Sequence, residues 1–268
     1  MIDYHIHTAR CGHGSGTAAD YLEKARSLNL HEIGFSEHLP LFHTIDATLA
    51  MSWDELPLYT AEVERLKTES EPGPGEVGTR VKLGIEVDYI PRFAEQARAA
   101  IEDYDFDFVM GSVHFIDGWG FDDRRYIDNY DAFDLRELYE RYFELFVEAA
   151  CSGLFDVMAH PDLIKKYFRL DDEPLALYER AARALAATGV AIEVSSAGLR
   201  KPCRDIYPGQ AFLDICFAEG VPVTTGSDAH TPNQLAMGFT AVYQALERAG
   251  YTEILSFTGR ERAPVALV

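Results

Sequence analysis

Short runs rich in Val, Ile and Phe alternate along this chain with longer stretches in which apolar residues recur every three or four positions. Runs of the first kind are typical of buried strands, and stretches of the second kind are typical of amphipathic helices. The pattern predicts strands at residues 2–6, 33–35, 81–87, 106–113, 157–158, 190–194 and 221–225, and helices at about 17–29, 53–70, 93–103, 131–152, 173–188, 208–219 and 232–249. This order calls for an α/β fold with a parallel sheet, either wound open or closed into a barrel.

The chain shows no convincing linker, so we expect one domain that spans residues 1–268. The Pro- and Gly-rich segment 71–76 is the one obvious irregular insertion, and we expect a loop there on the face away from any functional site. The four cysteines show no paired spacing and are expected to be reduced thiols.

The charge balance limits what the chain can bind. Asp and Glu number 44 against 24 Lys and Arg, which gives a net charge of −20. A field of that sign repels nucleic-acid phosphates and anionic lipid surfaces. The longest apolar runs are shorter than the roughly 18 residues that span a bilayer, and the first residues do not resemble a signal peptide. We therefore expect a cytoplasmic protein without nucleic-acid or membrane partners, and we leave its oligomeric state open.

Residues that bind metals or transfer protons follow six of the seven predicted strands. They are His5 and His7, His38, Glu86 with Asp88, His114, His160 with Asp162, and Asp228 with His230. Only the sixth strand, which runs into Ser195 and Ser196, lacks a histidine or an acid at its end. In a parallel barrel the carboxyl ends of all strands meet at one rim, where active sites of such folds lie. We therefore expect these side chains to be neighbours in space.

The spacing within these motifs favours a metal site. In an extended strand residues i and i+2 point the same way, so His5 and His7 can bind one ion, as can Asp228 and His230. Imidazoles with carboxylates suit Zn²⁺, Mn²⁺ or Fe²⁺. Each motif alone has another interpretation, since His-X-His arises by chance, Glu86 can pair with an arginine and Asp228 can cap a helix. Their coincidence at six strand ends favours the metal.

These motifs resemble those of the polymerase and histidinol phosphatase (PHP) superfamily, and within it the branch of monofunctional histidinol-phosphate phosphatases. The resemblance runs over the whole chain. It is carried by His5-Ile6-His7-Thr8 with His13, Ser36-Glu37-His38, the segment FVMGSVH at 108–114, Ala159-His160-Pro161-Asp162, SSAGLRKP at 195–202, and Gly226-Ser227-Asp228-Ala229-His230.

The resemblance implies a distorted (β/α)7 TIM-like barrel and three divalent transition-metal ions (Zn, Mn or Fe) at the strand ends. The first ion would take His5, His7, Glu86 and Asp228, the second would share Glu86 and add His114 and His160, and the third would take His13, His38 and His230. Glu37 stands where the family commonly has Asp, which leaves the role of that acid open. The role of Cys11 is also left open.

A small phosphate ester is the expected substrate. Its hydrolysis is slow because a nucleophile must approach a dianion and an alkoxide must leave. A hydroxide that bridges two ions solves both problems, so we expect it to be the nucleophile. The chain has neither a Gly-rich phosphate loop nor a Cys-X5-Arg motif, so no phosphoenzyme is expected.

Catalytic roles are assigned to Glu86 and Asp228, which would hold the ions, and to Asp162, which would either protonate the leaving alkoxide or orient a metal-bound histidine. Phosphate oxygens also need cationic donors. We expect Arg200 first and Lys165 second to supply them, ahead of Lys166 and Lys201, and we expect His43 and Phe115 to contact an imidazole-bearing substrate. We interpret His31 as a bystander.

The resemblance thus implies hydrolysis of L-histidinol phosphate to L-histidinol and phosphate in histidine biosynthesis. The alternative is a phosphoesterase of the same family for another small phosphate ester or a nucleotide. A metal-binding regulator without activity is disfavoured by the complete ligand set beside Arg200. An amidohydrolase is disfavoured because Glu86 stands on the middle strand where a carbamylated lysine would be needed.

Overall fold

Seven parallel strands form the centre of the molecule in the computed structural model, which describes residues 1–73 and 78–267. In order across the sheet they are β1 (Ile2–Asp3), β2 (Glu32–Phe35), β3 (Arg80–Asp88), β4 (Phe108–Ser112), β7 (Val157–Met158), β8 (Ala191–Ser195) and β9 (Val223–Gly226). Every neighbouring pair is parallel. All seven predicted strands are confirmed, with shorter bounds at several ends.

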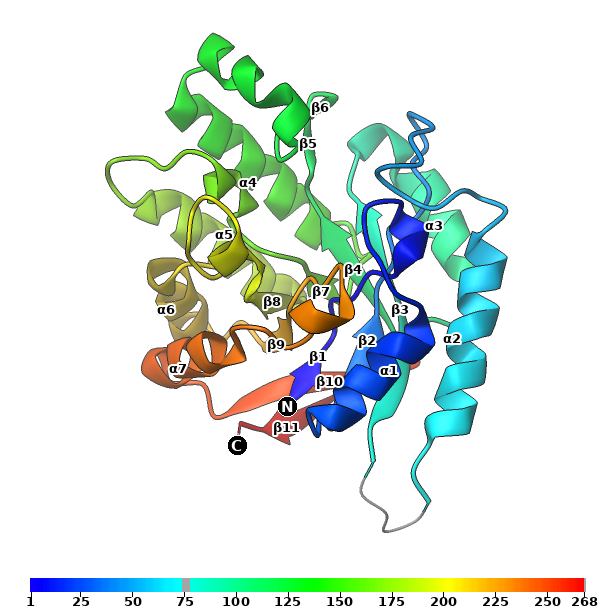
Figure 1. The fold of residues 1–268 in the computed structure, drawn as a ribbon. Coiled ribbons are helices and arrows are strands. Elements are labelled where there is room, and N and C mark those ends of the chain that lie inside the picture. The colour runs from blue at the N-terminus through cyan, green and yellow to red at the C-terminus, as the bar shows by residue number, and fades with distance from the viewer. Residues whose placement is uncertain (74–77, 268) are drawn as a thin grey trace.

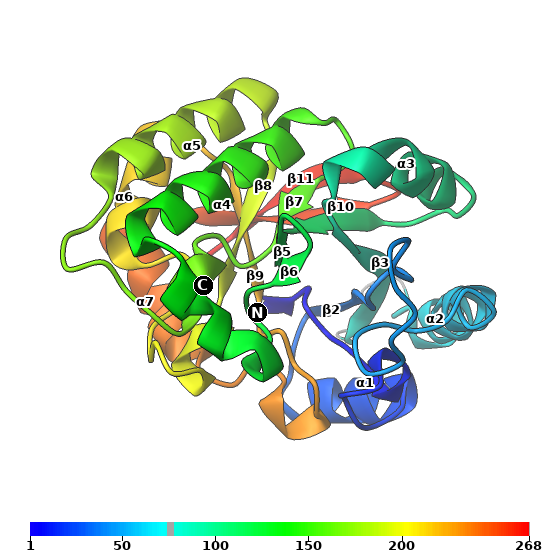
Figure 2. The ribbon, with the colours of Figure 1, turned by 90° about the horizontal axis from the view of Figure 1, so that it is seen from above.

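The two outer strands of this sheet approach each other and nearly close it into a barrel. The Tyr4 amide donates to the Thr225 carbonyl at 3.0 Å, and the Ala229 amide donates to the His5 carbonyl at 2.9 Å. Seen from above, the helices surround this ring of strands (Figure 2). The barrel alternative of the prediction is therefore confirmed, and all strand ends point to one rim.

The seven predicted helices are also confirmed. They are α1 (Ala18–Ser27), α2 (Leu56–Ser70), α3 (Ala94–Glu102), α4 (Leu135–Cys151), α5 (Leu175–Thr188), α6 (Gln210–Ala218) and α7 (Phe239–Ala249). The prediction for the last helix, from residue 232, is wrong at its start. Pro232 opens a short 3₁₀ turn, and Gly238 adopts a φ of 87°, so regular helix begins only at Phe239. Among the described residues no helix is long and apolar enough to cross a membrane.

Two hairpins were not predicted. β10 (Glu253–Thr258) and β11 (Glu261–Ala266) pair antiparallel below the barrel, at the amino-terminal ends of its strands (Figure 1). The Phe257 amide donates to the Tyr4 hydroxyl at 3.0 Å, which ties this hairpin to β1. β5 (Phe115–Ile116) and β6 (Trp119–Gly120) form the second hairpin, above β4, and lead into the 3₁₀ helix η3 (Arg124–Ala132). The strands β5 and β6 have two residues each, which is too short to give a clear alternating pattern. β11 has six residues but is largely exposed, so it forms no apolar run.

The predicted loop at 71–76 lies only partly within the described structure, because residues 74–76 are outside the described residues. Glu71 lies 3.5 Å from Arg80, the first residue of β3, in an ion pair. This part of the loop therefore sits at the amino-terminal end of a strand, opposite the rim that carries the histidines, as expected.

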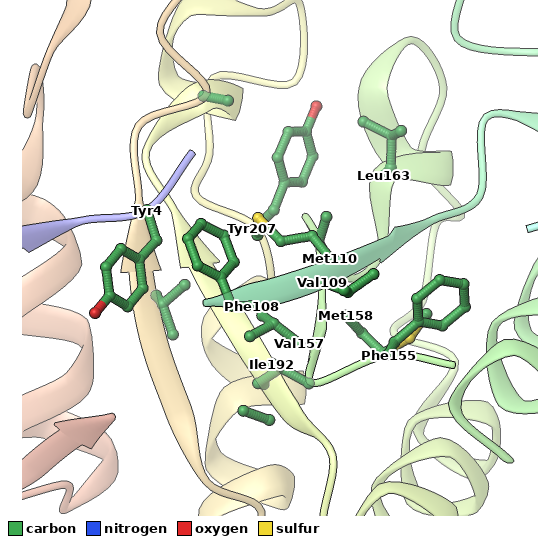
Figure 3. Close-up of a cluster of buried hydrophobic side chains, with 14 of the residues drawn as sticks. Tyr4, Phe108, Val109, Met110, Phe155, Val157, Met158, Leu163, Ile192 and Tyr207 are labelled. Atoms are coloured by element: carbon green, nitrogen blue, oxygen red, sulfur yellow. The ribbon is translucent and has the colours of Figure 1, made fainter. Parts of the chain in front are cut away.

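Aromatic side chains fill the lower part of the barrel. Tyr4 stacks on Phe108 with 4.8 Å between ring centroids, and both rings are fully buried (Figure 3). Gly34 and Gly84 make room for them, because a Cβ at either position would overlap the Phe108 ring. These rings form a packed layer beneath the rim that carries the histidines.

This packing predicts the effect of adding one methyl group. Gly84→Ala should lower the free energy of unfolding by about 1–3 kcal/mol, because the Phe108 ring must leave its position in a close-packed core. The matched control is Gly120→Ala, where the new Cβ would make only contacts of 3.4 Å or longer and the expected change is small. Denaturant unfolding of both variants checks this, and equal stabilities would contradict it.

Candidate metal centre

The fold brings all nine predicted ligands to the carboxyl-terminal rim. Eight of them lie in or directly after strands: His5 and His7 after β1, His38 after β2, Glu86 in β3, His114 after β4, His160 after β7, and Asp228 and His230 after β9. The ninth, His13, lies in the loop between the 3₁₀ turn η1 (Ala9–Cys11) and α1. Their rings are neighbours, with centroid distances of 4.3 Å between His7 and His38 and 4.5 Å between His13 and His230. The expectation of one cluster from distant segments therefore agrees with the geometry.

The Glu86 carboxylate lies at the centre of this cluster. Its Oε2 is 3.3 Å from His5 Nε2, 3.4 Å from His7 Nε2 and 3.0 Å from His38 Nδ1, and its Oε1 is 3.0 Å from His160 Nε2 and 3.9 Å from His114 Nε2. Burial alone would raise the pKa of Glu86, but the surrounding imidazoles, His5 foremost, hold it well below its usual range. A carboxylate at this position is thus ionised.

The imidazole of His7 is held in its uncharged form, whereas Glu86 is held in its charged form. Burial, with His38 and His230 as the nearest like neighbours, holds the pKa of His7 well below its usual range. His7 is therefore neutral near pH 7 and keeps a lone pair on one ring nitrogen. A neutral imidazole beside an ionised carboxylate is the protonation state that divalent metals bind.

The buried polar atoms of the cluster fit divalent ions. His5 Nε2, both ring nitrogens of His7, Glu86 Oε2 and His230 Nε2 are buried without a hydrogen-bond partner. Buried polar atoms are normally paired, so a group of orphaned donor atoms that face one another indicates a missing cation. The ligand atoms lie within 4.8 Å of one another in these sets: His5, His7 and Asp228; His5, Glu86 and His160; His38, Glu86 and His114; His7, His38 and His230.

One of these sets, His5 with His7 and Asp228, falls within a single ion of the implied division. The other three join ligands that were assigned to different ions, and His13 is in none of the four. Its ring groups with Cys11 and His230 rather than with His38. The Cys11 thiol donates to the Thr8 carbonyl at 3.2 Å and accepts from the Gly14 amide at 3.1 Å, and burial raises its pKa to about 12. Cys11 is therefore a neutral thiol that shapes the loop carrying His13.

Several acids hold the histidines in place. Asp88 Oδ1 lies 2.8 Å from His114 Nδ1, and Glu193 Oε1 lies 3.0 Å from His5 Nδ1. Glu37 accepts the Thr8 amide at 2.6 Å and places Oε2 3.8 Å from His7 Nδ1. Asp88 was expected at this rim only as one of the acids at the strand ends, and Glu193 was not predicted at all. Glu193 could have been found as a charged residue inside the apolar strand 190–194, because a buried charge needs hydrogen-bond or ionic partners in the protein interior.

A cavity of about 760 Å³ opens above the cluster and carries cations on its wall. Lys166, Arg200, Lys201 and Arg124 line it, together with Asp122. Arg200 Nη2 donates to the Ser227 and Asp228 carbonyls at 2.6 and 3.0 Å, whereas its Nη1 is buried without a partner. One arm of the guanidinium is thus fixed and the other is free for an anion.

Lys165 and Asp162 do not line this cavity. Lys165 is 5% exposed, and its Nζ is 2.8 Å from Asp162 Oδ2 and 3.1 Å from Asp205 Oδ2. Asp162 Oδ2 also accepts the Gly209 amide at 2.9 Å, and burial raises the Asp162 pKa to about 6. Because these groups bind each other away from the cavity, the geometry does not favour the predicted phosphate contact for Lys165 or proton donation by Asp162.

The two predicted contacts for an imidazole-bearing substrate differ in position. Phe115 lines the main cavity and also a second cavity of about 420 Å³, whereas His43 lines only the second and lies edge-on to Phe115, with 4.6 Å between ring centroids. His43 can therefore orient Phe115. His31, interpreted as a bystander, is exposed and lies 3.0 Å from Arg80, far from the rim.

Comparison with known proteins yields consistent matches. The model of the PHP domain matches residues 3–197. A Deinococcus radiodurans protein named "Probable histidinol-phosphatase" is 34% identical over 265 residues, 98% of this chain and 99% of that protein. A crystal structure of histidinol phosphate phosphatase from Lactococcus lactis, complexed with Zn, L-histidinol and phosphate, superimposes with a TM-score of 0.81 at 22% identity over 98% of both chains. A Listeria monocytogenes structure gives a TM-score of 0.76 at 21% identity, over 90% of this chain and 99% of that one.

The central position of Glu86 generates a prediction on metal content. Protein purified without chelators should contain more than one equivalent of divalent metal, and Glu86→Gln should lose most of it, because the carboxylate faces ligands of several sets. His31→Ala should keep the wild-type content. Elemental analysis of the three proteins checks this. A single ion in the wild type, or an unchanged content in Glu86→Gln, would refute the shared role of the carboxylate.

Proposed function

Since the chain belongs to the PHP domain family, we propose that it is a metal-dependent phosphomonoesterase that cleaves L-histidinol phosphate to L-histidinol and phosphate. The observation that carries this proposal is the buried Glu86 carboxylate, surrounded by imidazoles, beneath a cavity whose wall includes Lys166 and Arg200. The name of the Deinococcus radiodurans relative, which matches over the whole chain, supports the same reaction, a step of histidine biosynthesis.

Three divalent transition-metal ions, Zn, Mn or Fe, would fit the donor set. The nine ligands would be His5, His7, His13, His38, Glu86, His114, His160, Asp228 and His230. When bound, such ions supply the Lewis acidity that activates water and offsets the charge of a phosphoryl group. The Lactococcus lactis protein binds Zn, which supports this choice of metal.

The cations of the wall would bind the phosphoryl oxygens. Arg200 offers its free Nη1 while two backbone carbonyls hold the other arm in place. Lys166 is anchored by Asp122 Oδ2 at 3.0 Å, and Lys201 lines the same cavity. We therefore propose Arg200, Lys166 and Lys201 for this role in place of Lys165. A net charge of −20 makes these local cations necessary, since the rest of the chain repels an anion.

Phe115 would contact the imidazole of the substrate. Its ring forms part of the cavity wall, and His43 supports it from behind. A flat apolar wall suits the face of an aromatic ring, which stacks with a preferred offset. The phosphoryl group and the imidazole would thus bind at different parts of one cavity.

The whole of residues 1–268 would form one such catalytic unit. The family model ends at residue 197, but β9 follows it and carries Asp228 and His230 into the same cluster. A site that needs ligands from both β1 and β9 cannot be divided between two units.

Steady-state kinetics on a panel of esters tests the function. We expect the highest kcat/KM for L-histidinol phosphate, whose imidazole would lie against Phe115. Lower values are expected for nucleoside monophosphates, because a ribose separates their aromatic base from the phosphate, and for sugar phosphates, because they have no aromatic ring. A higher kcat/KM for a nucleotide or sugar phosphate would establish the other small-ester activity instead. Absence of hydrolysis with every ester in the metal-loaded protein would overturn the enzymatic proposal.

The role of Arg200 is testable by substitution. Arg200→Met should reduce kcat/KM for the phosphate ester by the equivalent of about 2–5 kcal/mol, as expected when a buried charged contact is truncated. Arg200→Lys should recover only part of this, since a point charge does not reproduce a fork. Arg204→Met is the matched control, because Arg204 is exposed and lies outside the cavity lining. Near-equal values for all variants would remove Arg200 from phosphate binding.

A further inference from the structure

Glu193 is a carboxylate in the interior of the barrel that the proposed chemistry does not use. It lies in β8, the strand whose end lacks a metal-type residue, and it is fully buried. Among the described residues no lysine or arginine forms an ion pair with it. A buried charge without a cationic partner is costly, so its position calls for a role.

Both oxygens of Glu193 have a hydrogen-bond partner, and the two partners belong to two different histidines. Oε1 lies 3.0 Å from His5 Nδ1, and Oε2 accepts the backbone amide of His160 at 2.6 Å. Gly226 lies beside this carboxylate at the end of β9, and a Cβ there would overlap Glu193 Oε1. The neighbouring strand therefore leaves room for the acid.

The first contact determines which nitrogen of His5 carries the proton. Where a carboxylate oxygen accepts this hydrogen bond, His5 Nδ1 holds the hydrogen. In the neutral imidazole the lone pair is then on His5 Nε2, which is buried without a hydrogen-bond partner and lies 3.3 Å from Glu86 Oε2 and 3.9 Å from Asp228 Oδ1. Glu193 thus directs the donor atom of His5 toward the metal-binding carboxylates.

The second contact holds the backbone of His160. This residue has a φ of 26°, in a region that non-glycine residues seldom occupy. The hydrogen bond from its amide to Glu193 stabilises that conformation. The His160 ring then places Nε2 3.0 Å from Glu86 Oε1, on the oxygen opposite to the one that faces His5.

We propose that Glu193 is a positioning residue of the metal centre, which sets the tautomer of His5 and fixes the backbone of His160, and so couples ligands on the two oxygens of Glu86. The inference rests on the proposed metal-dependent function. Glu193 itself touches neither metal nor substrate, so its loss acts through the affinity of the site for metal.

Glutamine cannot replace this acid. One end of an amide is a donor, whereas the site presents a donor at both ends. If the amide NH₂ faces the His160 amide, two donors oppose each other. If it faces His5, the imidazole must accept at Nδ1, and its hydrogen moves to Nε2, where it blocks metal binding. The substitution therefore changes one atom and reverses a hydrogen bond.

The test compares Glu193→Gln with Glu32→Gln by zinc titration against a competing chelator. Glu32 is a second buried glutamate, 4% exposed, in the parallel strand β2, but it contacts Tyr4 and Lys82 below the barrel. We expect Glu193→Gln to weaken zinc binding about 10–100-fold, the usual effect of losing a partner of a ligand histidine. Glu32→Gln should bind zinc as the wild type does, whatever it costs in stability.

A second readout separates positioning from a general loss of structure. In the zinc-loaded, histidine-¹⁵N-labelled protein, the wild type should show a Nδ1–H signal for His5, assigned by its absence in His5→Gln. Glu193→Gln should lose this signal, and Glu32→Gln should keep it. Glu193→Asp keeps the carboxylate but shortens the side chain by one methylene, so it should bind zinc more weakly than the wild type. This variant replaces Glu193→Gln in the test if the glutamine variant does not fold.

The outcomes are distinguishable. Wild-type zinc affinity in a folded Glu193→Gln or Glu193→Asp protein, or an unchanged His5 signal in Glu193→Gln, would overturn the inference while leaving the proposed function intact. Failure of the wild-type protein itself to bind zinc would overturn the metal centre, and with it both proposals.

Discussion

The buried carboxylate of Glu86 is the group on which the rest of the rim depends. A lone ionised acid in a protein interior would take up a proton, because burial disfavours charge. Here imidazoles from β1 and from the ends of β2, β4 and β7 approach both of its oxygens, and they hold its pKa well below the usual range. Divalent ions would compensate the charge of Glu86 further, and they would also bind the ring nitrogens of the cluster that have no hydrogen-bond partner.

The barrel makes this arrangement possible through its closure. Asp3 in β1 accepts the amides of Ser227 and Ala236 at 2.8 and 2.9 Å, which fixes the loop after β9 against the first strand. Asp228 and His230 lie on that loop. Below them the stacked rings of Tyr4 and Phe108 fill the barrel. The polar cluster therefore lies above a layer of packed aromatic rings.

Much of this was predictable from the sequence, because strand periodicity and the residues that follow each strand are local properties. His5, His7, Glu86 and Asp228 could be placed on one rim by topology alone. The direction of side chains in the turns beyond the strands could not. Asp162 has a φ of 62°, and it turns toward Lys165 and away from the cavity, which no pattern in the sequence indicates. The partners of Glu193 come from segments 33 and 188 residues away and need coordinates to be identified.

Anomalous diffraction at the zinc edge from crystals of the zinc-loaded protein tests the central claim most directly. We expect more than one anomalous peak at the rim, with one ion bound to each oxygen of Glu86 and with zinc–oxygen distances of about 2.0–2.2 Å. A single peak, or peaks that leave the Glu86 carboxylate without a metal contact, would contradict it.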